Sequence, residues 1–257
     1  MANSSLNKTT LTLNGQLQQF DPGQTIMEVA VNNGCYIPHL CHHPDYPAHG
    51  SCKLCTVTAD GRAQCACTTE ATEGMNIETD TEQLQQYRRQ LTELLFVEGN
   101  HYCPTCERAG NCQLQATAYE VGMSNGGYEF RYPSRQLDAS HSQLVLDRDR
   151  CILCGLCVRA SEEEGKGVFT ISGRGPQSQL AVNSDTGLLA DSRLEVTDKA
   201  AHICPVGALI VRGEGFNIPI GSRLYDHQTI KSVGNSRPDY SDNSPQPKAS
   251  KEDRSNG

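Results

Sequence analysis

The sequence has no tryptophan, and only 5% of its 257 residues are aromatic, so apolar material for a large core is scarce. Hydrophobic residues make up 37% of the chain, and the mean hydropathy is −0.51. Small domains with thin cores are usually held together by disulfides or metals. The composition therefore favours two or three small cross-linked domains over one large apolar core.

Further absences exclude whole classes of protein. No run approaches the roughly 18 apolar residues of a membrane span, and residues 1–15 have no apolar stretch after a basic one, so we expect neither a span nor a secretory signal. The 30 acidic against 22 basic residues give a net charge of −8, which argues against a nucleic-acid partner. There is no P-loop, nucleophile elbow or Ser/His/Asp arrangement. We expect a cytoplasmic protein without an active site of its own.

Cysteine is abundant instead, since the chain has 13 and eleven of them fall into three sets. In a reducing cytoplasm such residues bind metals rather than form disulfides. Each set supplies four ligands, the number that one iron–sulphur cluster needs, so the three sets predict an electron relay. The sets read Cys41-x10-Cys52-x2-Cys55-x11-Cys67, then His101-x-Cys103-x2-Cys106-x5-Cys112, then Cys151-x2-Cys154-x2-Cys157 with Cys204-Pro205 downstream.

The first set predicts a [2Fe–2S] cluster. Cys52 and Cys55 form the close pair, and Cys41 and Cys67 reach in from either side. The ten residues between the first two ligands depart from the plant-type spacing. A structural zinc site is the alternative, because C-x2-C pairs also build zinc ribbons. Cys65 is the alternative to Cys67 as fourth ligand.

The second set combines one histidine with three cysteines, and it predicts a [4Fe–4S] cluster. Zinc accepts the same four ligands equally well, so the motif by itself leaves both metals open. Its position between two cluster loops favours iron–sulphur. Replacing one thiolate by a neutral imidazole also makes the site less negative, which by itself makes reduction easier.

The third set has the spacing of a bacterial ferredoxin half-site and predicts a second [4Fe–4S] cluster. In two-cluster ferredoxins the remote cysteine before the proline serves the other cluster. This chain has no second C-x2-C-x2-C run, so Cys204 is expected to close the same cluster as Cys151, Cys154 and Cys157.

The remaining cysteines and histidines near the first set receive structural interpretations. Cys35 is expected to be a small buried hydrophobe. Four histidines could suggest a further metal site, but we interpret them as surface residues of the loop. They are His39, His42, His43 and His49.

Turn and capping signals organise the N-terminal third of the chain. Asn14-Gly15 and Asp60-Gly61 are two-residue hairpin signals, and Thr25-x-x-Glu28 is a capping box that opens a helix ended by Gly34. The strands expected around the two turns are 10–13 with 16–20 and 56–59 with 62–67. This order of elements is that of a β-grasp ferredoxin.

Two helices are expected around the second set. The apolar residues of 81–97 recur at steps of three and four, which predicts an amphipathic helix that Gly99 stops, and 114–121 predicts a short helix. We interpret the apolar stripe as ordinary core packing. Its members are Leu84, Tyr87, Leu91, Leu94 and Leu95.

The fold class expected is therefore α+β, in three metal-binding parts and a tail. Between Cys157 and Cys204 lies an insertion of 46 residues, and the last residues are almost devoid of apolar side chains, which predicts disorder. The parts are a β-grasp [2Fe–2S] domain at 9–80, a helical His/Cys3 [4Fe–4S] linker domain at 81–140, a bacterial-ferredoxin-like four-Cys [4Fe–4S] domain at 141–231, and a disordered tail at 232–257.

The order of the loops resembles the N-terminal part of the large iron–sulphur subunit of respiratory complex I. It is more similar still to the diaphorase-side iron–sulphur subunit of soluble NAD-reducing [NiFe] hydrogenases, over about residues 10–230. One residue separates His101 from Cys103, as in the hydrogenase family, whereas complex I usually has three. No cysteine follows Cys204, which is typical of the shorter members. The resemblance is carried by Tyr36–Cys41, Phe96–His101, Gly110–Gln115 and Arg150–Cys154.

The resemblance implies partners: a flavoprotein subunit that binds FMN and NAD(H), and the small and large subunits of a [NiFe] hydrogenase. This chain would pass single electrons between them without catalysing a reaction itself. By analogy with complex I, electrons would run from the [2Fe–2S] cluster to the four-Cys cluster and then to the His/Cys3 cluster.

Two other functions remain open on the sequence. One is the same relay in an NAD-dependent formate dehydrogenase or a complex I variant, which neighbouring genes would distinguish. The other is a zinc-stabilised scaffold without redox function, which a colourless protein containing zinc would support.

Overall fold

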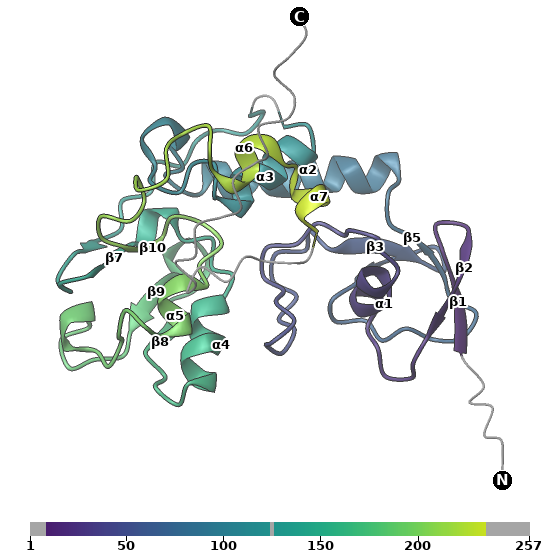
Figure 1. Ribbon diagram of the computed structural model, residues 1–257, viewed down its shortest axis with the longest axis horizontal. Coiled ribbons are helices and arrows are strands. Elements are labelled where there is room, and N and C mark those ends of the chain that lie inside the picture. Colours follow the sequence, from purple (N-terminus) through teal and green to yellow (C-terminus); the bar gives the residue numbers. More distant parts are fainter. Residues whose placement is uncertain (1–8, 124–125, 235–257) are drawn as a thin grey trace, which may run out of the picture.

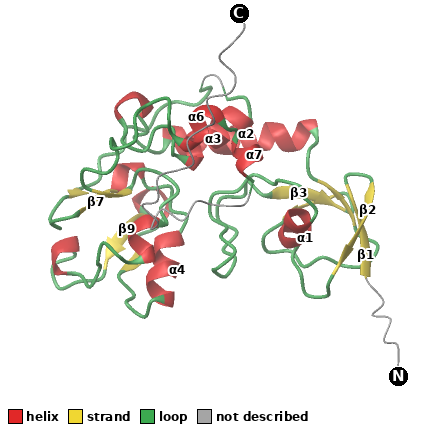
Figure 2. Ribbon diagram, in the orientation of Figure 1, coloured by secondary structure: helices red, strands yellow, loops and turns green. Residues whose placement is uncertain are grey.

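The computed structural model describes residues 9–123 and 126–234 and arranges them in two lobes joined by a layer of helices (Figure 1). One lobe is built from the N-terminal part of the chain and holds a five-stranded sheet. The other lobe holds a three-stranded and a two-stranded sheet (Figure 2).

The N-terminal lobe is a β-grasp fold, as predicted. Its sheet has the order β2-β1-β5-β3-β4, in which β1 and β5 are parallel and the other neighbours antiparallel. Apolar side chains of α1 pack on the sheet in one buried core. The elements are β1 (Thr9–Leu13), β2 (Gln16–Phe20), α1 (Ile26–Asn32), β3 (Thr56–Ala59), β4 (Arg62–Cys65) and β5 (Asn76–Glu78).

The predicted turns and cap of this lobe are confirmed. Asn14 and Gly15 have φ of 51° and 77°, the positive values that a two-residue hairpin turn of type I′ needs. The Thr25 hydroxyl accepts a hydrogen bond from Glu28 N at 3.2 Å, and the Glu28 carboxylate accepts one from Thr25 N at 2.6 Å. This capping box satisfies two N–H groups at the start of α1.

Two details of the lobe differ from expectation. Strand β4 ends at Cys65, so Cys67 lies in the turn after the strand instead of within it. Strand β5 was not expected, because three residues are too short to show an alternating pattern. Its parallel pairing with β1 completes the sheet.

The helical layer begins with α2 (Glu82–Val97), for which Thr81 is the N-cap, and continues with a 3₁₀ turn at Cys103–Thr105 and α3 (Gln113–Glu120). The expected apolar stripe of α2 is only partly correct. Leu84 is buried, but Tyr87 and Leu94 are 41% and 38% exposed. Arg88, which the stripe omits, is 2% exposed. Hydrogen bonds make the burial of Arg88 possible, because its guanidinium donates to two carbonyl oxygens of the β-grasp lobe. These are the carbonyls of Leu54 and Thr56, at 3.2 and 3.0 Å.

The second lobe contains the sheet β10-β7-β6 and the hairpin β8-β9, the latter formed by the 46-residue insertion. Helices α4 and α5 pack together within it. The strands are β6 (Leu137–Asp138), β7 (Leu144–Asp147), β8 (Phe169–Ser172), β9 (Gln179–Val182) and β10 (Leu209–Val211), and the helices are α4 (Leu156–Glu163) and α5 (Lys199–His202). The helices that follow in the chain, α6 (Leu224–His227) and α7 (Ile230–Val233), lie in the helical layer with α2 and α3 (Figure 1).

The expected second and third domains are closely joined in the structure. Strand β6, which falls before the predicted boundary at residue 140, pairs with β7 beyond it. One core also contains buried residues from both regions and from the first cysteine loop, for example Leu114, Leu146 and Leu54. The proposed tail begins inside a helix, because α7 extends to Val233. Residues 235–257 lie outside the described part of the chain.

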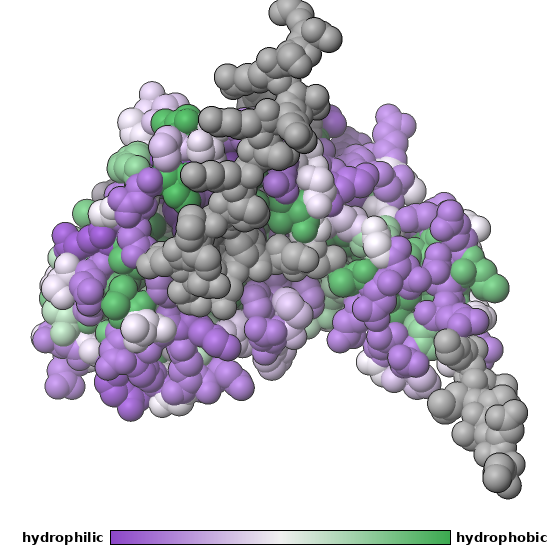
Figure 3. Space-filling view, in the orientation of Figure 1, coloured by the Kyte–Doolittle hydropathy of each residue, from purple (hydrophilic) through white to green (hydrophobic). Residues whose placement is uncertain are grey.

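On the face shown in Figure 3, hydrophilic residues dominate and hydrophobic ones are scattered. None of the helices in the described ranges is both long and apolar enough to traverse a bilayer.

Candidate iron–sulphur sites

The first set of cysteines lies on the long loop between α1 and β3 and in the turn after β4. The structure brings its members together in two pairs: the Cys55 and Cys67 sulphurs are 3.4 Å apart, and Cys52 N lies 3.5 Å from the Cys41 sulphur. Cys41, Cys55 and Cys67 are at most 1% exposed. Lys53, between the close pair, has a left-handed φ of 56°. This unusual conformation for a non-glycine residue turns the loop sharply between its two ligands.

Hydrogen bonds within the two pairs shift their acidities in opposite directions. A hydrogen bond from the Cys52 thiol lowers the pKa of Cys41 to about 4, and the one from Cys55 lowers the pKa of Cys67. The same bonds, with burial, raise the pKa of Cys52 and of Cys55. In each pair one thiol therefore loses its proton more readily than the other, and cluster binding would release the protons that remain, because the ligand form is the thiolate.

The neighbours of this set differ partly from expectation. Cys35 is half-buried, and its sulphur lies 3.6 Å from the Thr79 hydroxyl and 3.7 Å from Asn14 Nδ2, so it has polar contacts instead of being a simple buried hydrophobe. His39 is 6% exposed, and its Nδ1 lies 2.8 Å from the Ile37 carbonyl oxygen, so the surface interpretation is wrong for this histidine. His49 is exposed, as expected.

The second set lies between α2 and α3. Cys112 is the N-cap residue of α3 and is 8% exposed. The ring of His101 packs against Gly99, where any Cβ would overlap it. His101 Nε2 is shielded from solvent and has no hydrogen-bond partner within residues 9–123 and 126–234. Burial, with the nearby Arg150 charge, lowers the pKa of His101 to about 4, so the ring is neutral at pH 7.

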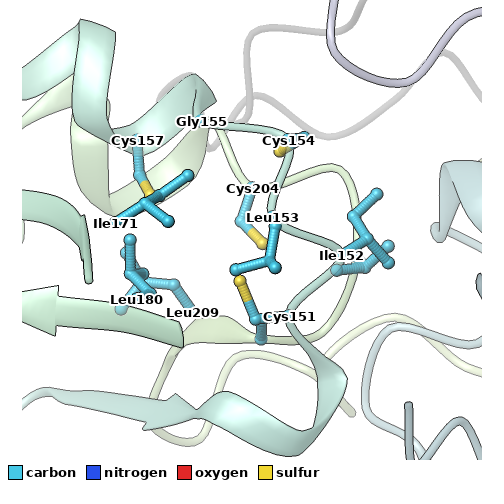
Figure 4. Close-up of a pocket in the computed structure, with 12 residues that line it drawn as sticks. Cys151, Ile152, Leu153, Cys154, Gly155, Cys157, Ile171, Leu180, Cys204 and Leu209 are labelled. Carbon is cyan, nitrogen blue, oxygen red and sulfur yellow. The ribbon is translucent and has the colours of Figure 1, made fainter. Parts of the chain in front are cut away.

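The third set converges on one cavity, which is the subject of Figure 4. Cys151, Cys154, Cys157 and Cys204 all line it, together with apolar residues such as Leu180. Cys204 comes from the segment after α5, so a residue 47 positions after Cys157 lines the same cavity as the triplet. Burial raises the pKa of Cys151 to about 11 and also raises the pKa of Cys157.

The third set and His101 suit the clusters that the sequence predicts. All 13 cysteines are free thiols, and the four of the third set surround a single apolar cavity. The buried, unpartnered Nε2 of His101 is a neutral nitrogen donor within the second loop. Leaving a buried polar atom unpaired is costly, and a metal bond at that atom would remove the cost. Thiolate sulphur and imidazole nitrogen are both known ligands of iron–sulphur clusters.

The second and third loops are in direct contact. The Arg108 guanidinium donates to the Cys204 carbonyl at 3.0 Å, and Gln113 N donates to the Pro205 carbonyl at 2.9 Å. Arg150 Nη1 lies 3.7 Å from the Cys106 sulphur. The first and third loops are also joined, because Arg159 on α4 donates to the Cys41 carbonyl at 2.6 Å.

Sequence reasoning missed these arginines, although a signal was present. Each lies within two positions of a cysteine of the second or third set: Arg108 after Cys106, Arg150 before Cys151, and Arg159 after Cys157. A charge next to a ligand cysteine has many possible directions, and only the fold shows which loop it reaches.

The fold and these ligand sets define an iron–sulphur protein made of a ferredoxin-like β-grasp part, a linker part and a second ferredoxin-like part. Three family models match in that order: a 2Fe-2S iron-sulfur cluster binding domain at residues 7–82, an NADH-ubiquinone oxidoreductase-G iron-sulfur binding region at 88–126, and a 4Fe-4S single cluster domain at 144–211.

Similar proteins narrow the class to one family. The chain is 39% identical over 225 residues to the gamma subunit of the NAD-reducing hydrogenase HoxS of Cupriavidus necator, covering 86% of this chain and 95% of that protein. It matches a chain in the crystal structure of an NAD+-reducing [NiFe]-hydrogenase in the H2-reduced state, with a TM-score of 0.86, 50% identity, and coverage of 88% and 97%. The chain belongs to the family of the gamma subunit of NAD-reducing hydrogenase.

The complex I resemblance is also confirmed. The chain is 32% identical over 213 residues to the G subunit of the NADH-quinone oxidoreductase of Mycobacterium tuberculosis. The match covers 78% of this chain but only 25% of that larger protein. The shared part therefore corresponds to about a quarter of the relative's length.

Proposed function

We propose that this chain is the electron-transfer subunit of an NAD-reducing hydrogenase. It would relay single electrons between a flavoprotein subunit that binds FMN and NAD(H) and a [NiFe] hydrogenase module made of a small and a large subunit, so that H2 oxidation is coupled to NAD+ reduction in either direction. The family membership supports this assembly, and the ligand sets supply the means of conduction. In this proposal the chain itself catalyses no reaction.

Twelve residues would hold the clusters. When bound, the clusters supply one-electron redox chemistry that no side chain of the protein offers. The [2Fe–2S] ligands are Cys41, Cys52, Cys55 and Cys67; one [4Fe–4S] cluster has His101, Cys103, Cys106 and Cys112; and the other has Cys151, Cys154, Cys157 and Cys204.

The contact between the loops is the observation that carries the proposal. The third loop contacts the first through Arg159 and the second through Arg108 and Arg150. The three sites would therefore form a series with the four-Cys site in the middle, which agrees with the order that complex I suggests. A structural zinc protein would not need three sites linked in this way.

The protein surrounds the sites with low-polarity groups and with arginines. Cys41, Cys55 and Cys67 are almost fully buried, and the third set lies in an apolar cavity. Buried thiolate clusters carry a net charge of about −2 each with four cysteines. Arginine donors to the carbonyls of the ligand loops, such as Arg159 on Cys41 and Arg108 on Cys204, offset part of that charge.

Anaerobic purification of the natural complex tests the proposal. We expect a brown protein that contains iron and acid-labile sulphide and co-purifies with a flavoprotein and with a nickel-containing subunit. A colourless protein containing zinc would contradict the redox function. Co-purification with a molybdenum subunit or with membrane subunits would instead identify a formate dehydrogenase or a complex I variant. Since the free thiols suit a reducing compartment, we also infer a cytoplasmic location, which cell fractionation checks.

A further inference from the structure

Arg159 on α4 joins the first and third ligand sets by hydrogen bonds. Its Nη1 donates to the Pro47 carbonyl and its Nη2 to the Cys41 carbonyl, both at 2.6 Å. Within the third ligand loop, which directly precedes α4, Nη2 also donates to the Cys154 carbonyl at 3.3 Å, and Nε donates to the Gly155 carbonyl at 3.2 Å. One side chain therefore contacts the backbone of a ligand residue from each of two sites.

The four acceptors of Arg159 are neutral carbonyl oxygens. No carboxylate in residues 9–123 or 126–234 lies within salt-bridge distance of its guanidinium, in contrast to Arg150, which pairs with Asp147 at 2.9 Å. The guanidinium is planar, remains protonated and presents five donors in a fixed fork, which suits it to holding several carbonyls at once. Its full positive charge thus lies between the two sites without a carboxylate partner among the described residues.

The bridge is also a long-range contact of this part of the loop. Arg159 and Cys41 are 118 residues apart in the sequence, and Arg159 and Pro47 are 112 apart. Within the loop, His43 and Tyr46 hydrogen-bond locally through their backbones. Residues 41–47 are therefore held against α4 by these hydrogen bonds together with core packing, since Cys41 and Tyr46 lie in the same buried core as Leu156 and Ala160 of α4.

We propose that Arg159 is a positioning residue for electron transfer between the [2Fe–2S] and four-Cys [4Fe–4S] sites. It fixes the loop of Cys41 against the loop of Cys154. Its positive charge would stabilise the reduced state of each of the two clusters. The step concerned is the passage of one electron, which oxidises one cluster and reduces the other, with no bond formed and no proton exchanged. This inference rests on the proposed function and adds a specific residue to it.

Two variants separate the geometric effect from the electrostatic effect. Arg159→Met keeps a long side chain but loses both the donors and the charge. Arg159→Lys keeps the charge but cannot reproduce the fork. We expect Arg159→Met to shift the midpoint potentials of both clusters to lower values and to weaken the magnetic interaction between the two reduced clusters in EPR. Arg159→Lys should leave the midpoint potentials of both clusters close to the wild-type values, but it should still weaken the magnetic interaction between them. Arg174→Met, an exposed arginine in the same lobe, is the matched control and should change neither.

A measurement that needs no redox activity completes the test. Hydrogen–deuterium exchange of the full-length protein should show faster exchange in residues 41–47 for both Arg159 variants, and no change for Arg174→Met. The inference is overturned if Arg159→Met binds its full iron complement and keeps wild-type potentials, wild-type magnetic interaction and wild-type exchange. The proposed function is tested separately by the iron and sulphide content of the wild-type protein, so the two can fail independently.

Discussion

The guanidinium of Arg108, in the His/Cys3 loop, donates a hydrogen bond to the backbone carbonyl of Cys204 at 3.0 Å, across 96 residues of sequence. The remote cysteine of the third set is thereby held by the second loop. Gln113 N donates to the neighbouring Pro205 carbonyl at 2.9 Å, which adds a second link at the same place. The two proposed [4Fe–4S] sites therefore share structural support.

This contact predicts that Arg108→Met weakens the four-Cys site as well as its own loop. Without the donor, the Cys204 segment loses a fixed contact, and its carbonyl is left without that partner. We expect the four-Cys cluster to be lost faster on incubation with an iron chelator, followed by the decay of its EPR signal. Arg174→Met should behave as wild type. Equal rates of loss in both variants would show that Arg108 does not support this site.

Metal content is the most direct check on the twelve ligands. Two irons in the first site and four in each of the others predict about ten irons per chain. Iron, sulphide and zinc analysis of the anaerobically purified protein measures this. A reproducible value of about six irons, with zinc making up the difference, would mean that one four-iron assignment is wrong.

The fourth ligand of the first site is predicted to be Cys67. Its sulphur lies 3.4 Å from that of Cys55, and it is 1% exposed, whereas Cys65 is only half-buried. Cys67→Ala should abolish the [2Fe–2S] EPR signal, and Cys65→Ala should leave it intact. A second control is Cys35→Ala, because the Cys35 thiol of the wild type contacts the Thr79 hydroxyl. Loss of the signal in Cys65→Ala alone would reverse the ligand assignment.

His101 is predicted to bind iron through Nε2. His101→Cys would replace a neutral imidazole by a thiolate, and the added negative charge disfavours reduction, so the potential of that cluster should fall. His101→Ala should leave an iron corner open and make the cluster prone to loss. Redox titration of the two variants against wild type measures both effects. Unmoved potentials in both variants would rule out the ligand role.

Gly99 offers an independent test of the same histidine. A Cβ at this position would overlap the His101 ring and would lie 3.1 Å from the Asp149 carbonyl oxygen. Gly99→Ala should therefore displace the ring and perturb the EPR signal of the His/Cys3 cluster, while the other two signals stay as in wild type. The control is Ala63→Gly, at an exposed position on strand β4, which should leave the EPR signal of the His/Cys3 cluster as in wild type.

Arg88 on α2 is predicted to stabilise the folded protein through its buried hydrogen bonds. It is 2% exposed and donates to the Leu54 and Thr56 carbonyls, on either side of Cys55. Arg88→Met should leave those carbonyls without these donors and destabilise the protein by about 2–3 kcal/mol. The thermal midpoint, followed by loss of visible absorbance, should fall for Arg88→Met. Gln86→Met, on the exposed face of α2, should leave it unchanged.

Much of the architecture was predictable from the sequence because its signals are local. The hairpin at Asn14-Gly15 depends on residues that tolerate positive φ, and the capping box depends on two side chains three positions apart. The ligand sets were recognisable because three or four ligands follow one another at short, characteristic spacings. Such features are determined by residues close in sequence and do not depend on tertiary contacts.

Other features were decided only by tertiary structure, because they depend on partners far away in the chain. The apolar stripe of α2 did not anticipate Arg88, since burial of an arginine requires acceptors that only the folded β-grasp lobe provides. His39 was expected at the surface, yet the packed loop buries it and places its Nδ1 beside a backbone carbonyl. Strand β5 exists because β1 and β3 offer it hydrogen bonds on both sides.

The sequence by itself determined which residues could bind metal and in which groups, because ligand chemistry and spacing are written along the chain. It did not determine how the three groups lie relative to one another. That arrangement depends on Arg108, Arg150 and Arg159, whose guanidinium groups reach from one loop to the next. A long side chain beside a cysteine can point in many directions, and only the packing of two lobes around a shared core selects the carbonyl or sulphur that it meets.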